Sequence, residues 1–206
     1  MNKLAIMGAG GHGKVVADSA ELAGWKHIEF FDDNWPEREL YQGWPITGNL
    51  SLLYHRAAEF DGFIVAIGNN KVRLELSEQL IDNHLNLVTI VHPSAIISRY
   101  TEIGPGTVLF ACSVVNSGTK IGIASIINTA ATIDHDCVLG KGVHISPGAH
   151  LGGEVIVGDC SWVGIGSAVR QQIIISDEVI VGAGASVVKN ISKQKTVVGV
   201  PAVDLE

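Results

Sequence analysis

A histidine flanked by two aspartates is the first group of residues suited to chemistry, because His135 stands between Asp134 and Asp136. An imidazole changes its protonation near neutral pH, so it can take a proton from a reacting group. A neighbouring carboxylate favours the protonated ring, which raises its basicity and fixes its tautomer. The triplet therefore predicts proton transfer, and the sequence alone leaves open whether Asp134 or Asp136 supports the ring.

A glycine-rich turn, Gly8-x-Gly10-x-x-Gly13, is the second such feature, and it lies between an apolar run and a helical pattern. Glycines let a ligand approach the backbone, and the free N–H groups at the start of a helix favour a diphosphate. Asp32 and Asp33 follow about twenty residues later and can accept hydrogen bonds from a ribose or a base. The pattern predicts a nucleotide site.

Two familiar nucleotide folds do not fit this turn. The roughly ninety residues before the repeat described below supply only half of the two-half fold that binds a dinucleotide such as NAD. A P-loop is also a poor match, because Val15 stands where a Ser or Thr would hold magnesium. We therefore expect one nucleotide to bind.

The elements around the turn predict a small parallel α/β domain over residues 1–91, because strands alternate with helices. We expect strands over 3–7, 27–31, 61–67 and 85–90, helices over 14–22 and 71–83, a short helix near 51–58, and a loop over 35–47. His92-Pro93 would stop the last strand. The boundary to the second domain, 92–206, is placed there.

A repeat of six residues organises the second domain. From Ile97 to Val187 every sixth residue is Ile, Val or Leu, and the residue two positions earlier is small or β-branched. This period fits neither an amphipathic helix nor a two-sided strand, but it fits short strands that meet at corners. Three faces make one coil, so residues eighteen apart stack. Glycine often follows the bulky residue, where we expect it to supply unusual corner dihedrals.

The core of this repeat is thin, so we expect an oligomer. The bulky register alone does not offset the conformational entropy of ordering the chain. The net charge of −7 argues against a nucleic-acid partner. Three cysteines without CxxC spacing indicate reduced thiols, with Cys137 packed in the small register. With no signal peptide and no apolar run of about 20 residues, we expect a cytoplasmic protein that does not enter the membrane.

Several motifs together resemble a known family. The unbroken repeat, the segment Asn128-Thr-Ala-Ala-Thr-Ile-Asp-His-Asp-Cys137 and the segment Val198-Gly-Val-Pro-Ala202 look like hexapeptide-repeat acyltransferases. Phe31-Asp-Asp-Asn34 and Ala66-Ile-Gly-Asn-Asn70 narrow the resemblance to bacterial sugar acetyltransferases of surface-glycan pathways. Within that group the chain looks especially like the UDP-4-amino-sugar N-acetyltransferases of the bacillosamine type, which are related to sialic acid O-acetyltransferases. The resemblance implies a left-handed parallel β-helix and a homotrimer with active sites between subunits.

The resemblance also implies roles for individual residues. His135 would be the general base, supported by Asp136. The nucleotide sugar would lie on Gly10, Gly11, His12, Asp32, Asp33, Gly68, Asn69 and Asn70, with Asn128 near its nucleophile. Acetyl-CoA would meet His144, Gly153, Ile165 and Ala183, and no metal is implied. The family usually has a basic residue after Gly-Val-Pro-Ala, but this chain has Val203-Asp204, so a tail contact to the coenzyme stays open.

The resemblance thus implies an acetyl-CoA-dependent N-acetyltransferase that acts on a UDP-linked 4-amino-4,6-dideoxy-N-acetylhexosamine, for which we expect direct transfer. An O-acetyltransferase of the sialic acid type uses the same scaffold and is the alternative. A carbonic-anhydrase-like metalloenzyme is less favoured, because His135, His144 and His150 lack the spacing of such sites. A non-catalytic hexapeptide scaffold would need neither the His-Asp pair nor the glycine turn.

Overall fold

The computed structural model describes residues 2–205, which form two compact units divided between Pro93 and Ser94. The first unit is an α/β fold, and the second is a three-sided parallel solenoid. Each unit is described separately below.

The first unit is built on one five-stranded sheet, in the order β3-β4-β2-β1-β5. Its strands are β1 (Lys3–Met7), β2 (His27–Phe31), β3 (Leu40–Tyr41), β4 (Trp44–Gly48) and β5 (Gly62–Val65). Its helices are α1 (Gly11–Leu22), α2 (Leu50–His55), the 3-10 turn η1 (Ala57–Glu59) and α3 (Asn70–Asp82), and β6 (Ile90–Val91) follows them. All pairs in the sheet are parallel except β3 with β4.

Alternation along the strands gives the sheet two apolar faces, and both are covered by helices. Met7 and Val65 lie in one buried cluster with Leu53 of α2 and Leu80 of α3. Phe30 points to the opposite face, where α1 approaches so closely that a Cβ on Gly13 would lie 3.1 Å from the Phe30 ring. The result is a three-layer unit with the sheet in the middle.

Two parts of the first unit differ from the sequence-based expectation. The predicted loop over 35–47 contains β3 and β4, joined by Gln42 and Gly43, which both have positive φ (49° and 101°). Two such residues make the tight turn that suits a hairpin, and Tyr41 and Trp44 then pack against Phe30 at centroid distances of 5.7 and 6.1 Å.

The strand predicted over 85–90 is also wrong in its extent. Leu87 forms only an isolated bridge to Phe63, and the next strand, β6, begins at Ile90 and is not part of the five-stranded sheet. The apolar residues there are buried as expected, but apolar content by itself does not fix how far a strand ladder runs.

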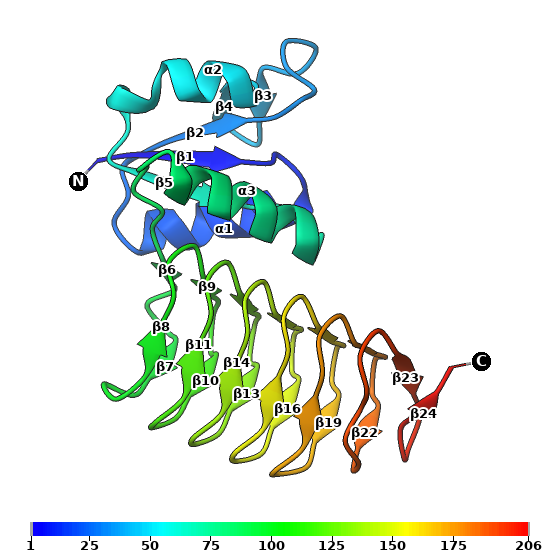
Figure 1. The fold of residues 1–206 in the computed structure, drawn as a ribbon. Helices are drawn as coiled ribbons and strands as arrows, with labels where there is room; N and C mark the ends of the chain where they lie inside the picture. The colour runs from blue at the N-terminus through cyan, green and yellow to red at the C-terminus, as the bar shows by residue number, and fades with distance from the viewer. Residues whose placement is uncertain (1, 206) are drawn as a thin grey trace. The chain divides into compact units, whose positions relative to one another are not determined.

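The second unit confirms the six-residue period as a solenoid with three sheets (Figure 1). The first sheet contains β7 (Ile96–Ile97), β10 (Val114–Val115), β13 (Thr132–Ile133), β16 (His150–Leu151), β19 (Ala168–Val169) and β22 (Ser186–Val187). The second contains β8 (Glu102–Ile103), β11 (Lys120–Ile121), β14 (Val138–Leu139), β17 (Ile156–Val157) and β20 (Ile174–Ile175). The third contains β9 (Val108–Leu109), β12 (Ile126–Ile127), β15 (His144–Ile145), β18 (Trp162–Val163), β21 (Ile180–Val181), β23 (Thr196–Val198) and β24 (Val203–Asp204).

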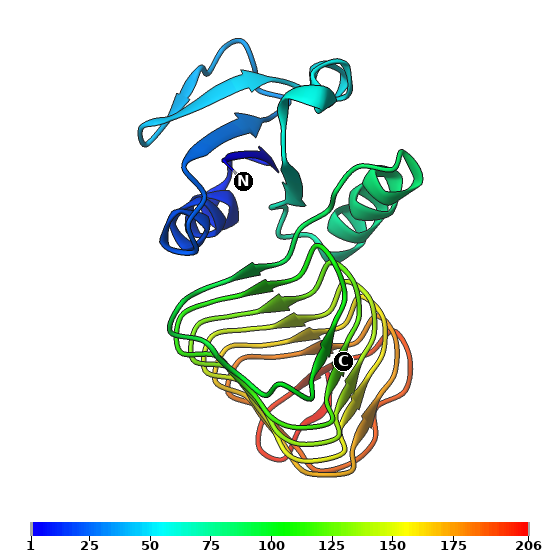
Figure 2. The ribbon, with the colours of Figure 1, turned by 90° about the vertical axis from the view of Figure 1, so that its left-hand side faces the viewer.

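Residues eighteen apart stack from coil to coil, as the pairs Val115 with Ile133 and Ile127 with Ile145 illustrate. Figure 2 shows the coils superimposed around a three-sided cross-section. The bulky register is buried from Leu109 to Val187, and Ile97 and Ile103 of the first coil are half-buried.

The small register contributes hydrogen bonds as well as space. Some of its buried hydroxyls donate to carbonyls of the following coil, as Thr119 does to Asp134 (2.8 Å) and Ser161 to Ser176 (2.8 Å). Buried polar groups need such partners, so these side chains hold successive coils in register. The buried Cys137 thiol takes the same position and donates to the Gly152 carbonyl at 3.3 Å.

The corners correct the expected role of the glycines that follow the bulky residues. Those glycines do not have positive φ; instead every sixth residue from Gly106 to Gly184 does, with φ between 55° and 77°. Non-glycine residues such as Asp136 and Glu154 occupy many of these left-handed positions. The glycine after the bulky residue is needed for space, because a Cβ on Gly122 would lie 2.7 Å from the Lys141 nitrogen in the next coil.

The C-terminal segment closes the last coil of the solenoid. Strand β24 runs antiparallel to β23, and the Lys195 ammonium donates to the Asp204 carboxylate at 2.8 Å. Among residues 2–205, no helix has the length and apolar character needed to cross a membrane.

The two kinds of glycine predict different costs of substitution. Gly122→Ala forces backbone of two coils apart and should lower the free energy of unfolding by about 2–3 kcal/mol. In Gly166→Ala the added Cβ meets no atom within 4 Å. Only its left-handed φ of 64° is unfavourable for alanine, so the free energy of unfolding should fall by about 1 kcal/mol. Denaturant unfolding of both variants measures the difference, and equal losses would contradict the spacing explanation.

Candidate active site

The glycine turn of the first unit forms the start of α1. The helix begins at Gly11, three residues before the expected start at Lys14, with Gly10 as its N-cap. Gly10 has no side chain to cap the helix, so the first-turn N–H groups of Gly11 and His12 are not bound by a cap side chain. Such N–H groups, with the positive end of the helix dipole, attract an anion.

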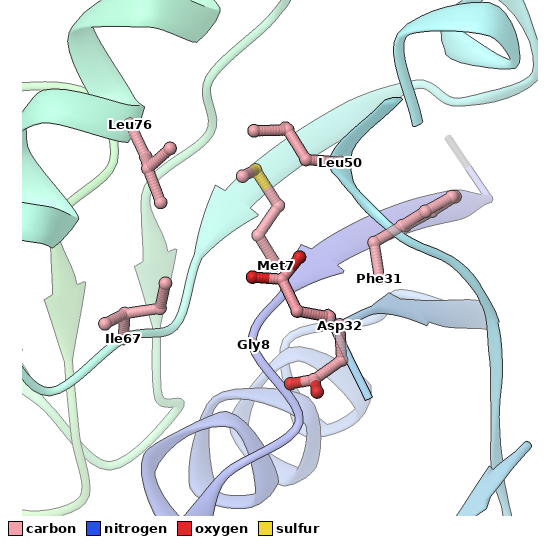
Figure 3. Close-up of a pocket in the computed structure, with 8 residues that line it drawn as sticks. Met7, Gly8, Phe31, Asp32, Leu50, Ile67 and Leu76 are labelled. Carbon is pink, nitrogen blue, oxygen red and sulfur yellow. The ribbon is translucent and has the colours of Figure 1, made fainter. Parts of the chain in front are cut away.

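A pocket opens beside this turn. It is lined by Gly8, Gly10, Gly11, His12, Asp32, Ala66, Ile67 and Gly68. An adjoining apolar pocket shares Gly8, Asp32 and Ile67 and adds Met7, Phe31, Asp33, Leu50 and Leu76 (Figure 3). In Figure 3, Leu50 and Leu76 extend from α2 and α3 toward the Met7 side chain. A polar turn next to an apolar slot suits a phosphate group joined to a flat base.

The two predicted aspartates of the pockets have different surroundings. Asp32 accepts the Ala9 N–H (2.7 Å) and both the backbone and side-chain N–H groups of Asn34 (3.0 and 2.7 Å). Burial acts to raise the pKa of Asp32, but these hydrogen bonds outweigh it and the pKa is lowered. Asp32 therefore ties the glycine turn to the end of β2, and Asp33 lines the apolar pocket.

The predicted Gly68–Asn70 segment is divided between pocket and scaffold. Gly68 lines the pocket, but the Asn69 side chain caps α3 by accepting the Val72 N–H at 3.1 Å. The Asn70 side chain is buried and accepts from Arg73 at 2.9 Å. In this structure the amides of both asparagines serve the start of α3 and neither residue lines the two pockets, so their part in substrate binding stays a prediction.

His12 is set in a positive environment. Burial and the charge of Arg73 lower the pKa of His12 to about 4, so the ring is neutral at neutral pH. It contributes a neutral hydrogen-bonding ring to the pocket.

Sequence reasoning missed a group of residues that packs on the glycine turn. The Tyr41 hydroxyl donates to the Gly10 carbonyl at 3.0 Å, and Arg38 donates to the Ala9 carbonyl at 3.3 Å. The Arg38 guanidinium also lies over the Tyr41 ring at 4.1 Å. These residues belong to the segment expected to be loop, and the aromatic residues on either side of Gln42-Gly43 were the signal that could have found them.

In the second unit, His135 lies at the edge between the first and second sheets, in the corner that joins β13 to β14. Its Nδ1 is 2.8 Å from the Asp136 carboxylate, and both side chains are exposed. The hydrogen bond to Asp136 is the main cause that raises the pKa of His135. Asp134 instead accepts the His135 backbone N–H (2.9 Å) and the Asn116 amide (3.0 Å). Of the two aspartates, Asp136 contacts the ring.

Gly153 lies one coil beyond His135 on the same edge, where the Glu154 N–H donates to the His135 carbonyl at 2.9 Å. A Cβ on Gly153 would lie 2.6 Å from the imidazole Cε1 and Nε2 atoms. The glycine therefore lets the ring lie flat against the next coil.

Asn128 and His144 form a second group. The Asn128 amide nitrogen is 3.2 Å from His144 Nε2, and the His144 ring stacks on Trp162 with centroids 5.2 Å apart and planes 11° apart. The Trp162 indole N–H donates to Ser146 at 2.6 Å. Asn128 and Trp162 thus fix the orientation of the imidazole, and the partnership with Trp162 was not predicted.

Three of the predicted acetyl-CoA residues lie on two different edges of the solenoid, and the fourth, His144, lies on β15 of the third sheet. Ile165 and Ala183 stack at the edge between the third and first sheets, where the Gly184 N–H donates to the Ile165 carbonyl at 2.8 Å. Asn128 belongs to that edge too, whereas Gly153 lies with His135 at the edge between the first and second sheets. One copy of the chain therefore carries two separate parts of the predicted site.

Two lysines near the C-terminus pair with carboxylates of the solenoid and of the C-terminal segment. Lys193 pairs with Asp177 at 3.1 Å and Lys195 with Asp204 at 2.8 Å. Within residues 2–205, no group of three or more His, Cys, Asp or Glu side chains is arranged to hold a metal ion.

Comparisons with known proteins agree with these observations. Residues 3–80 match the family model described as the PglD N-terminal domain. The chain is 37% identical over 113 residues to UDP-N-acetylbacillosamine N-acetyltransferase of Bacillus subtilis (strain 168). That match covers 54% of this chain, and the chain spans about half the length of this curated relative.

Solved structures match over nearly the whole chain. The acetyltransferase domain of PglB from Neisseria gonorrhoeae FA1090, in complex with acetyl coenzyme A, is 42% identical with a TM-score of 0.95, and the match covers 98% of each chain. A mutant of perosamine N-acetyltransferase from Caulobacter crescentus, in complex with CoA and GDP-perosamine, is 34% identical with a TM-score of 0.94, covering 99% of this chain and 97% of that one. These matches confirm the predicted fold, an α/β domain followed by a left-handed parallel β-helix.

The contact between Asp136 and His135 predicts a measurable shift in titration. Asp136→Asn should lower the pKa of His135, because the carboxylate that stabilises the protonated ring is lost. Asp134→Asn should change it less, since Asp134 bonds the backbone rather than the ring. NMR titration of the His135 ring in both variants measures this order, and the reverse order would make Asp134 the supporting residue.

Proposed function

The chain belongs to the hexapeptide-repeat sugar N-acetyltransferases, and from this premise we propose that it acetylates the 4-amino group of a UDP-linked 4-amino-4,6-dideoxy-N-acetylhexosamine with acetyl-CoA. The observation that carries the proposal is the 2.8 Å contact of His135 with Asp136 on an exposed corner of the solenoid. The chain combines this base with a glycine turn suited to a nucleotide diphosphate.

The proposed reaction is a direct transfer. His135 takes a proton from the amine as its nitrogen attacks the thioester carbonyl carbon, and the carbon–sulfur bond then breaks to release CoA. Asp136 holds the ring and stabilises its protonated form. Asn128 and His144 supply polar groups that stabilise the negative charge developing on the carbonyl oxygen.

The cysteines support a mechanism without an acyl-enzyme. Cys137 is buried, and burial raises the pKa of its thiol, which opposes formation of the nucleophilic thiolate. Cys160 lies at the edge between the second and third sheets, which carries none of the proposed catalytic residues, and Cys112 lies on the Asn128 edge with its Sγ 3.9 Å from the Ser94 hydroxyl. Three free thiols also suit the cytoplasm, the compartment we propose.

The assembly that we propose is a homotrimer with one active site at each subunit contact. The His135 edge of one copy would meet the edge of the next copy that carries Asn128, Ile165 and Ala183. A stripe of exposed apolar side chains on the second sheet supports packing against another copy: Val138 (44% exposed), Ile156 (43%) and Ile174 (45%).

The test of this function is a thiol-release assay with acetyl-CoA and a panel of acceptors. We expect release with a UDP-linked 4-amino sugar, because the amine is the nucleophile, and little with UDP-GlcNAc or a sialic acid. Release with a GDP-linked amino sugar alone would support N-acetylation but would show that the nucleotide of the substrate carries guanine instead of uracil. Release with hydroxyl acceptors alone would move the function to O-acetylation.

His135→Ala serves as the mechanistic control in the same assay. Loss of a general base should cut kcat by about 10²–10⁴-fold without unfolding the protein. His150→Ala is the matched variant, because His150 is also exposed but contacts Thr132 on a neighbouring strand at 2.8 Å. Parent-level turnover in His135→Ala would contradict the assignment.

A further inference from the structure

Arg73 is the one Asp, Glu, Lys or Arg side chain that is fully buried among residues 2–205, with 1% of its surface exposed. It lies in the first full turn of α3, where the other buried polar side chains, Asn70 and Ser77, carry no charge. Moving a charge from water into a protein interior costs several kcal/mol unless the surroundings compensate it. The burial of Arg73 in spite of this free-energy cost points to a specific role for its charge and hydrogen bonds.

The guanidinium is directed into the loop between β5 and α3. One nitrogen, Nη1, donates to the carbonyls of Ile67 (3.0 Å) and Gly68 (3.2 Å), and Nη2 donates to the Asn70 side chain (2.9 Å). These acceptors span the whole turn from the end of the strand to the start of the helix. The planar fork of arginine suits this arrangement, which a lysine ammonium cannot reproduce.

The loop held by Arg73 is the wall of the nucleotide pockets. Ile67 lines both pockets, and Gly68 lines the one beside the glycine turn. Gly8 of the glycine turn packs directly against this loop, since an added Cβ would be 3.0 Å from both the Ala66 carbonyl and the Ile67 side chain. A shift of the loop would therefore change the shape of the pocket directly.

The charge of Arg73 also reaches the pocket. The His12 ring lines the same pocket, and after burial the charge of Arg73 is the second cause that lowers the pKa of His12. In a chain with a net charge of −7, an anionic ligand needs local positive charge. A buried cation provides it without being screened by solvent as a surface lysine is.

We propose that Arg73 is a positioning residue of the nucleotide site, which holds the Ile67–Asn70 loop in its binding conformation and places a fixed positive charge behind it for a nucleoside diphosphate. The proposal rests on the proposed function, because it assigns the nucleotide of the sugar donor to this pocket. It gives Asn70 the role of a support for Arg73.

The experiment titrates uridine, UMP and UDP, with GDP in parallel, into the full-length parent and the Arg73→Met and Arg73→Lys variants by calorimetry. UDP affinity should fall about tenfold or more in Arg73→Met, since a charged hydrogen-bonding group is lost. The loss should grow from uridine to UDP, because the charge acts on the phosphates. Arg73→Lys, which keeps the charge but loses the fork, should fall between the parent and Arg73→Met.

Arg56→Met is the matched control, because Arg56 belongs to the same unit but pairs with Glu29 and Glu59 and lines neither pocket. It should bind UDP like the parent. In turnover assays, Arg73→Lys should raise KM for the nucleotide sugar and leave KM for acetyl-CoA unchanged.

Circular dichroism separates binding from folding. If Arg73→Met does not fold, the folded Arg73→Lys variant decides. UDP affinity within twofold of the parent in a folded Arg73 variant would overturn the inference about Arg73 and would leave the proposed function standing. A parent that binds neither UDP nor GDP would overturn the proposed function and this inference with it.

Discussion

The solenoid depends on one constraint, which is that residues eighteen apart must stack in register. Backbone hydrogen bonds between coils and buried hydroxyls such as Thr119 and Ser161 enforce that register. Every corner residue therefore belongs to a column along one edge of the prism. His135 shares its column with Gly153, and Ile165 shares another with Ala183. Because the columns lie on different edges, the fold itself decides which predicted site residues can meet within one chain and which need a second copy.

In the first unit, the glycine-rich turn has few side chains that can pack, so its conformation depends on contacts from the surrounding residues. Three polar contacts fix the surrounding backbone: Asp32 to the Ala9 N–H, Tyr41 to the Gly10 carbonyl, and Arg73 to the Ile67 carbonyl. Each comes from a different element, so the turn is braced from several sides. The N–H groups at the start of α1 are then held in place for an anion.

Much of this could be predicted from sequence because the signals are periodic or local. The six-residue period fixes the solenoid, and the strand before the glycine turn ends at Met7 as expected. The hairpin at Tyr41 and Trp44 was missed because β3 has only two residues and because Gly43 and Pro45, which are typical of loops, lie in its turn and second strand. The left-handed positions were misplaced because Asp136 and Glu154 tolerate a φ usually associated with glycine. The roles of Asn69 and Asn70 depend on where α3 starts, and an asparagine pair looks the same whether it faces a ligand or caps a helix.

The central claim is that an active site combines the His135 edge of one subunit with the Asn128 edge of another. Mixing subunits tests it most directly: His135→Ala and Asn128→Ala proteins, each nearly inactive alone, are unfolded and refolded together in equal amounts. Random cyclic trimers should recover about a quarter of the parent activity, since about one contact in four then joins two intact edges. Recovery of that size would support sites shared between subunits, and a mixture as inactive as either variant alone would contradict them.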